Sequence, residues 1–172
     1  MHQSPTKPLR HVIITGGAGF IGSQICARLI KGKTRVTILT RNVSAPRATA
    51  LAQQGCKVVP CDLADAHRIP RPDTLDPADT LFHFAADVSV NSPTLRAANV
   101  DGTSRALALA DSLAIPYVVY ASSIEAQGLG SDNEIPLRED MACRPVSDYG
   151  QSKVQAEELV TTWGSLPGHR AL

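Results

Sequence analysis

The sequence has no long apolar run and almost no excess charge, and both features narrow the functions open to it. Its 172 residues carry a formal net charge of +1, so the composition favours neither nucleic acid nor an anionic membrane surface as a partner. No apolar stretch approaches the length needed to span a bilayer. Internal repeats and low-complexity segments are also absent, and the length suits one well-cored domain, expected over residues 9–172.

The sequence also lacks the cysteine spacing of metal and redox sites. Its four cysteines, Cys26, Cys56, Cys61 and Cys143, include no C-x-x-C pair, so we expect small buried apolar side chains and no metal. Residues 1–8 are polar, contain two prolines and lack the apolar core of a signal peptide, so they are expected to form a flexible tail. A cytoplasmic location fits these features.

A glycine turn near the start is the strongest feature that is present. The β-branched run Val12–Ile14 leads into glycines spaced G-x-x-G-x-x-G and then into an amphipathic helical pattern. Free backbone N–H groups and the positive end of the helix dipole would make this turn an anion site. Gly16 would permit the tight turn, Gly19 would admit a pyrophosphate, and Gly22 would let the helix pack on its strand. An ordinary βα turn is the alternative.

Further β-rich runs alternate with helical patterns along the chain. We expect strands over 34–40, 57–60, 80–84 and 116–121, helices over 46–54, 93–114 and 146–163, and loops over 68–79 and 125–144. The second of these loops is long and polar, which favours an active-site surface. Strands that alternate with helices predict an α/β fold of Rossmann type, a doubly wound parallel sheet of about five strands with helices on both faces.

The segment after the second expected strand lacks the acid that normally accepts a hydrogen bond from the ribose 2′-hydroxyl of NAD. Thr40-Arg41-Asn42 stands there instead. A carboxylate would repel a 2′-phosphate, whereas Arg41 could pair with one through two hydrogen bonds. A solvated loop arginine is the alternative. The missing acid favours NADP over NAD as the cofactor.

Residues at the ends of the next two strands are candidates for the same ligand. Asp62 could accept from an adenine amino group and Leu63 could cover the ring, although Asp62 could equally cap a helix. Ala85 and Ala86 are small enough to let a cofactor approach the backbone. His83 lies inside its strand, so we expect a packed core histidine rather than a ligand.

Tyr149 and Lys153 form the candidate centre of chemistry. Residues four apart share one face of a helix, so both side chains can reach one crevice. A lysine cation favours the phenolate and would lower the tyrosine pKa from its usual value of about 10. Ser123 follows the fifth expected strand and could donate to a substrate oxygen, or could cap a helix or turn. Asn99 has poor helix propensity within its expected helix, which indicates a hydrogen-bonding role.

In this order the residues resemble the NAD-dependent epimerase/dehydratase family of extended short-chain dehydrogenases/reductases. The matching motifs are Thr15-Gly16-x-x-Gly19-Phe20-Ile21-Gly22, Asp62-Leu63, His83-Phe84-Ala85-Ala86, Asn99-Val-x-Gly102-Thr103, Ser122-Ser123 and Tyr149-x-x-x-Lys153. The resemblance implies that Tyr149 transfers a proton, that Lys153 binds the nicotinamide ribose and tunes Tyr149, and that Ser123 orients the reacting oxygen during hydride transfer. The implied cofactor residues are Gly16, Gly19, Phe20, Ile21, Gly22, Arg41, Asp62, Leu63, Phe84, Ala85, Ala86, Asn99, Tyr149 and Lys153.

The chain also departs from the family pattern. Its Ser122–Gly128 segment reads S-S-I-E-A-Q-G where sugar-nucleotide epimerases usually read S-S-x-x-V-Y-G. Ile124 stands where dehydratases of the family have aspartic acid, so elimination of water is disfavoured, and Arg41 resembles the NADP-dependent reductase branch. Family members continue into a sixth strand and a substrate domain, so we expect this chain to stop before that domain.

Two functions follow from this comparison. The first is an NAD(P)-dependent oxidoreductase or epimerase that acts on a hydroxyl or ketone, with a nucleotide sugar as a candidate substrate. The second is a truncated, non-catalytic dinucleotide-binding module. The resemblance also implies that a homodimer would pair the helices around Asn99 and Tyr149.

Overall fold

The computed structural model describes residues 9–89, 91–128, 137–138 and 140–172. Its strands are β1 (His11–Thr15), β2 (Arg35–Thr40), β3 (Lys57–Pro60), β4 (Thr80–His83), β5 (Tyr117–Tyr120) and β6 (Arg170–Ala171). Its α-helices are α1 (Phe20–Lys31), α2 (Pro46–Gln53), α3 (Gly102–Ser112), α4 (Ile124–Gln127) and α5 (Asp148–Gly164). Two 3₁₀ turns, η1 (Ala66–Arg68) and η2 (Pro72–Thr74), and a π-helix, η3 (Ala97–Asp101), complete the described elements.

The strands form one parallel sheet in the order β3-β2-β1-β4-β5-β6. The chain moves outward from β1 on one side and from β4 on the other, so the strand order reverses between these two neighbours. In sheets of this kind a ligand crevice opens beyond the carboxyl ends of the strands at the point of reversal. The Rossmann-type prediction is confirmed, and β6 makes the sheet one strand wider than expected.

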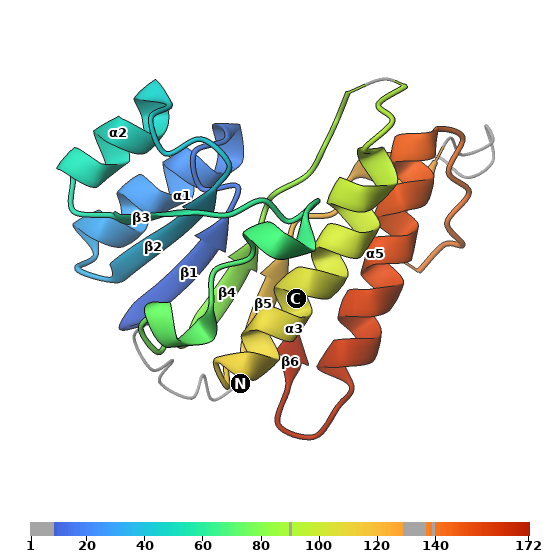
Figure 1. The fold of residues 1–172 in the computed structure, drawn as a ribbon. Coiled ribbons are helices and arrows are strands. Elements are labelled where there is room, and N and C mark those ends of the chain that lie inside the picture. Colours follow the sequence, from blue (N-terminus) through green and yellow to red (C-terminus); the bar gives the residue numbers. More distant parts are fainter. Residues whose placement is uncertain (1–8, 90, 129–136, 139) are drawn as a thin grey trace.

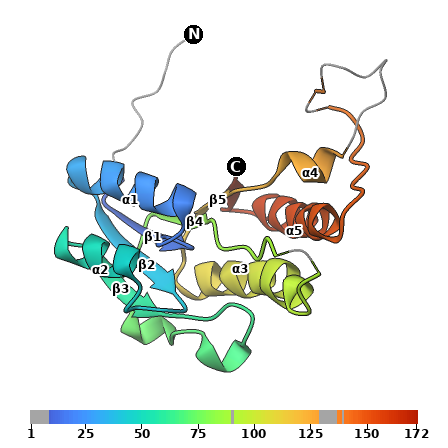
Figure 2. The same ribbon diagram turned by 90° about the horizontal axis from the view of Figure 1, so that it is seen from above.

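Helices cover both faces of the sheet because its side chains alternate between two apolar cores. Val12 and Ile14 of β1 face the core beneath α1 and α2, whereas Ile13 faces the core beneath α3 and α5. Figure 1 shows α1 and α2 on one side of the strands and α3 and α5 on the other, and the view from above in Figure 2 shows the same two groups. Burial on both faces explains why β1 reads as a continuous apolar run.

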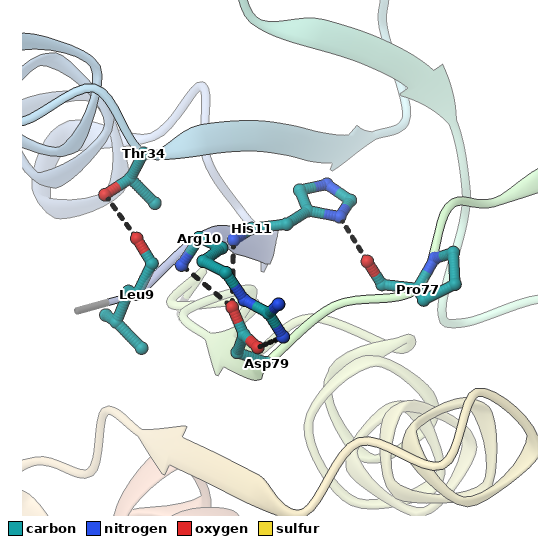
Figure 3. A network of polar contacts seen from close by, with 6 residues as sticks. All are labelled: Leu9, Arg10, His11, Thr34, Pro77 and Asp79. Carbon is teal, nitrogen blue, oxygen red and sulfur yellow. Dashed lines mark hydrogen bonds and ion pairs between the residues drawn. The ribbon is translucent and has the colours of Figure 1, made fainter. Parts of the chain in front are cut away.

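A polar network fixes the amino end of β1, opposite the crevice (Figure 3). The Asp79 carboxylate accepts from the backbone N–H groups of Arg10 at 2.8 Å and His11 at 3.1 Å, and these bonds hold the pKa of Asp79 below its usual value. The His11 ring bonds the Pro77 carbonyl at 2.7 Å, and the Thr34 hydroxyl donates to the Leu9 carbonyl at 3.0 Å. These contacts hold β1 in register with its neighbours.

The helix predicted over 93–114 begins later than expected. Leu95 and Arg96 are its first helical residues, and the π-helix η3 follows them and leads directly into α3. The Asp87 carboxylate accepts from the hydroxyls of Ser92 at 2.5 Å and Thr94 at 3.2 Å, so the start of the expected helix is held in a loop. Side-chain bonds of this kind compete with helical backbone bonds.

Two other expectations are corrected or narrowed, and a third concerns residues outside the described part of the chain. Cys26, Cys56 and Cys61 are buried as predicted, but Cys143 is exposed. The loop expected over 125–144 begins inside α4, and residues 129–136 and 139 of it lie outside the described part of the chain. The tail expected at residues 1–8 also lies outside that part. Among the described residues, no helix combines the length and apolar character needed to cross a bilayer, and no cluster of His, Cys, Asp and Glu could hold a metal.

The structure predicts that Gly16 cannot be replaced without a loss of stability. Its backbone conformation disfavours a side chain, and neighbouring backbone atoms leave no room for one. Its φ is +67°, and a Cβ there would lie 2.6 Å from the backbone nitrogen of Ala85. Gly168 has φ +85° but no atom within 4 Å of such a Cβ, so Gly168→Ala isolates the cost of the left-handed conformation. We expect Gly168→Ala to lower the free energy of unfolding by about 1 kcal/mol and Gly16→Ala by about 3 kcal/mol or more, as measured by urea denaturation. Equal losses would show that the close approach of the two backbones does not constrain the fold.

Candidate dinucleotide site

A cavity of about 330 Å³ opens at the carboxyl ends of β1 to β4, beside the point where the strand order reverses. Backbone and small side chains of the glycine turn form one wall, and the segments after β2, β3 and β4 form the others. The predicted cofactor residues on its lining are Gly16, Gly19, Arg41, Asp62, Leu63, Phe84, Ala85 and Ala86. The structure therefore brings together residues that are up to 70 positions apart in the chain.

The glycine turn forms a narrow cradle at the start of α1. The Gly19 amide donates to the Gly16 carbonyl at 2.9 Å, which closes the turn. A Cβ on Gly22 would lie 2.4 Å from that carbonyl oxygen, so the absence of a side chain lets α1 begin against the turn. No acidic residue lies in the first turn of α1, so the helix dipole and the free amides present a positive field to the cavity.

Arg41 lies on the cavity wall at the end of β2. It makes no ion pair within the described part of the chain, so its guanidinium is available to a ligand. Asn42, beside it, accepts from the backbone N–H of Ser44 at 3.0 Å and so orders the turn that follows. This position is compatible with a solvated arginine and with an arginine that binds a phosphate.

Asp62 and Leu63 lie on the wall formed by the chain after β3. One Asp62 oxygen accepts from the backbone N–H two residues on at 3.1 Å, and the other pairs with Arg68 at 3.4 Å. The helix cap nearby is Asp65, which accepts from the backbone N–H of His67 in η1 at 2.9 Å. Arg105 of α3 donates to the Leu63 carbonyl at 2.6 Å. The capping alternative for Asp62 is thus wrong, and its carboxylate orders the cavity wall.

Tyr149 and Lys153 lie in the first two turns of α5, as their spacing predicts. The Ser147 hydroxyl caps this helix by accepting from the Gly150 amide at 2.9 Å. Neither Tyr149 nor Lys153 lines the 330 Å³ cavity, which ends at the residues after β4. They lie further along the same carboxyl edge, beyond β4 and next to the end of β5.

The Lys153 ammonium is held at the end of β5. Nζ donates to the Ala121 carbonyl at 2.5 Å and lies 4.2 Å from the centroid of the Tyr120 ring. Only 2% of the residue is exposed, and this burial lowers the pKa of Lys153 to about 8, against an opposing effect of the Glu157 charge. The pKa leaves Lys153 largely protonated at neutral pH.

Ser123 caps α4, because its side-chain oxygen accepts from the Glu125 amide at 3.2 Å. The cap uses the oxygen as an acceptor and leaves the hydroxyl proton available to a substrate oxygen. Glu125 in turn accepts from the Ser147 hydroxyl at 2.6 Å, which ties α4 to the start of α5. The Ser122 hydroxyl makes a short hydrogen bond to Glu157. Sequence reasoning missed the roles of both glutamates, since only their side-chain partners reveal them.

Several predicted cofactor residues lie elsewhere. Phe20 and Ile21 begin α1 with 76% and 54% exposure and do not line the cavity. Gly22 is buried behind the glycine turn. Asn99 is 2% exposed and also lies outside the cavity lining. Its amide accepts from the Asp87 N–H at 2.7 Å and donates to the Asp87 carbonyl at 2.9 Å, so its role is to hold the chain after β4.

His83 is a buried core histidine, as predicted, and it joins two parts of the site. Its Nε2 lies 2.9 Å from the Thr103 hydroxyl, which itself donates to the Asn99 carbonyl at 2.6 Å, so Nε2 carries the proton. Its Nδ1 then accepts from the Thr15 hydroxyl at 2.6 Å. Burial, with the Lys153 charge, lowers the pKa of His83 to about 3, so the ring is neutral at physiological pH.

Comparison with known proteins agrees with this geometry. The model of the NAD dependent epimerase/dehydratase family matches residues 12–172. A UDP-glucose 4-epimerase of Streptococcus mutans serotype c is 30% identical over 156 residues, which cover 87% of this chain and 46% of that protein. The chain thus spans about half the length of the curated relatives it matches, or less.

Solved structures of similar proteins share this fold. A UDP-galactose 4-epimerase is 29% identical with a TM-score of 0.79, over 94% of this chain and 54% of that one. MoeE5 in complex with UDP-glucose and NAD is 28% identical with a TM-score of 0.78, over 94% of this chain and 51% of that one. Because the family model covers the chain from β1 to its last residue, this protein belongs to the NAD-dependent epimerase/dehydratase family.

Proposed function

We propose that this chain provides the cofactor site and the proton-transfer residues of an NAD(P)-dependent oxidoreductase or epimerase. Its substrate would be a hydroxyl or ketone of a nucleotide sugar. One observation carries the proposal: the glycine-lined cavity and the Tyr149–Lys153 helix open at the same carboxyl edge of the sheet. The similar proteins named above are epimerases of UDP-sugars or bind UDP-glucose, which supports a nucleotide sugar as substrate.

The residues present fit a dinucleotide. The cradle at Gly16 and Gly19 excludes side chains and leaves room for a pyrophosphate beside the start of α1. Leu63 offers an apolar side chain to an adenine ring, and Ala85 keeps the wall after β4 close to the ligand. A nicotinamide cofactor bound there would accept a hydride from the substrate carbon or return one to it.

The chain's own residues would handle the proton. As a phenolate, Tyr149 would take the proton from the substrate hydroxyl during oxidation and would return it during reduction. The Lys153 ammonium, held at the end of β5, would supply positive charge at the same edge of the sheet. Ser123 would donate its free hydroxyl proton to the reacting oxygen and so orient it, while its cap on α4 fixes the position of its own oxygen.

We also propose that Arg41 favours NADP over NAD. Arg41 lines the cavity and makes no ion pair within the described part of the chain, and no acid stands at 40–42 to repel a 2′-phosphate. A guanidinium and a phosphate make strong, paired hydrogen bonds.

The cofactor proposal predicts a selective effect of Arg41→Ala. We expect it to weaken NADPH binding roughly 10- to 100-fold, the range for loss of a charge-assisted hydrogen bond, with NADH binding unchanged. Calorimetric titration of each nucleotide would measure both affinities. Arg35→Ala is the matched control, because Arg35 is exposed at the opposite end of the same strand and should leave both affinities unchanged. Equal losses for NADPH and NADH would remove Arg41 from cofactor selection.

The catalytic proposal predicts that Tyr149→Phe lowers turnover by roughly 10²- to 10⁴-fold and leaves cofactor affinity within about twofold, because only the phenol oxygen is lost. Turnover would be followed with UDP-glucose and UDP-galactose, and affinity by the same titration. Tyr117→Phe is the control, since Tyr117 is half exposed at the amino end of β5. Undiminished turnover in Tyr149→Phe would contradict the assignment. Cofactor binding without turnover in the unmodified chain would instead favour a non-catalytic module.

A further inference from the structure

Lys153 is almost completely buried, which is unusual for a residue that carries an ammonium group. It is 2% exposed, and an ammonium has three donors to satisfy. One proton goes to the Ala121 carbonyl at 2.5 Å, and the group lies 4.2 Å from the centroid of the Tyr120 ring. An aromatic face within about 6 Å attracts a cation through its negative quadrupole. The attraction of the ring therefore compensates for part of the hydration that the ammonium loses on burial.

Tyr120 contributes its ring here and not its hydroxyl. The hydroxyl is buried and makes no hydrogen bond within the described part of the chain. The ring stacks on the neutral His83 ring at 5.6 Å with an interplanar angle of 28°. With the His83 ring stacked on it and the Lys153 ammonium near its centroid, the ring forms an aromatic platform at the end of β5.

Within the described residues, the other charged or titratable groups near Lys153 do not contact its ammonium as the Tyr120 ring does. Glu157 follows Lys153 by one helical turn and favours its charge, but it accepts a hydrogen bond from Ser122. His83 on β4 is neutral. Tyr149 lies on the same helix, close enough for its charge to affect the pKa of Tyr120.

We propose that Tyr120 is a positioning residue, whose ring holds the Lys153 ammonium at the end of β5 in its charged form before any cofactor is present. The functional consequence rests on the proposed role of Lys153 beside Tyr149. An ammonium that is already held at the strand end loses less conformational freedom when a ligand arrives. It also keeps its positive charge at the carboxyl edge of the sheet, next to the helix of Tyr149.

The test is the titration of Lys153 in the protein without cofactor. The ¹³Cε signal of Lys153 in ¹³C-lysine-labelled protein, assigned by its absence in Lys153→Arg, would be followed from pH 6 to pH 11. Tyr120→Leu removes the quadrupole and should lower the pKa of Lys153 by roughly half to one pH unit, a three- to tenfold change in its acid constant. Tyr120→Phe keeps the ring and should titrate as the unmodified protein does.

A merely structural role for Tyr120 would not give this pattern. Tyr120→Met replaces Tyr120→Leu if the latter does not fold, as judged from its amide spectrum. The inference is overturned if the variants without an aromatic ring titrate like Tyr120→Phe, or if Tyr120→Phe shifts as far as they do. Because no cofactor is added, a shift in the expected direction supports the platform even if NADPH and NADH later fail to bind, a failure that would count against the proposed function alone.

Discussion

The close approach of two backbones at Gly16 is the constraint on which the site depends. A side chain at that position would collide with the chain just after β4, so the turn after β1 and the segment after β4 form adjoining walls only because Gly16 has no Cβ. Thr15 strengthens the contact, since its hydroxyl oxygen accepts from the Ala85 amide at 3.3 Å. The two strands on either side of the point of reversal are thereby joined at their carboxyl ends, where the cavity opens.

From this junction, buried hydrogen bonds extend to the helix of Tyr149. His83 bonds Thr103, and Thr103 bonds the Asn99 carbonyl. The Asn99 amide donates to Ser152 at 3.0 Å, and the Ser152 hydroxyl donates to the Tyr149 carbonyl at 2.7 Å. An unsatisfied polar group in this interior would be costly, so the chain of bonds fixes the distance between the glycine-lined cavity and the helix of Tyr149. Asn99 thus supports the site from behind rather than lining it.

The parts of the site that depend on local sequence could be predicted, and the parts that depend on distant partners could not. The glycine spacing and the four-residue separation of Tyr149 and Lys153 are local, and they placed the turn and the helix correctly. The late start of the helix before α3 depends on Asp87 bonding residues five and seven positions further on, which no periodicity reveals. The outward direction of Phe20 likewise depends on how α1 packs on the sheet. Glu125 is a third case, because its contact with the α5 cap exists only in the folded chain.

The proposed function requires a dinucleotide to bind in the cavity at the carboxyl edge of the sheet. Amide chemical shifts of ¹⁵N-labelled protein, recorded while NADPH is added, test it most directly. We expect changes at Gly19, Leu63 and Ala85, on three walls of the cavity, and none at Asp79 beside the amino end of β1. Changes confined to the second cavity, of about 280 Å³ between residues 91–96 and α5, or no changes at all, would contradict it.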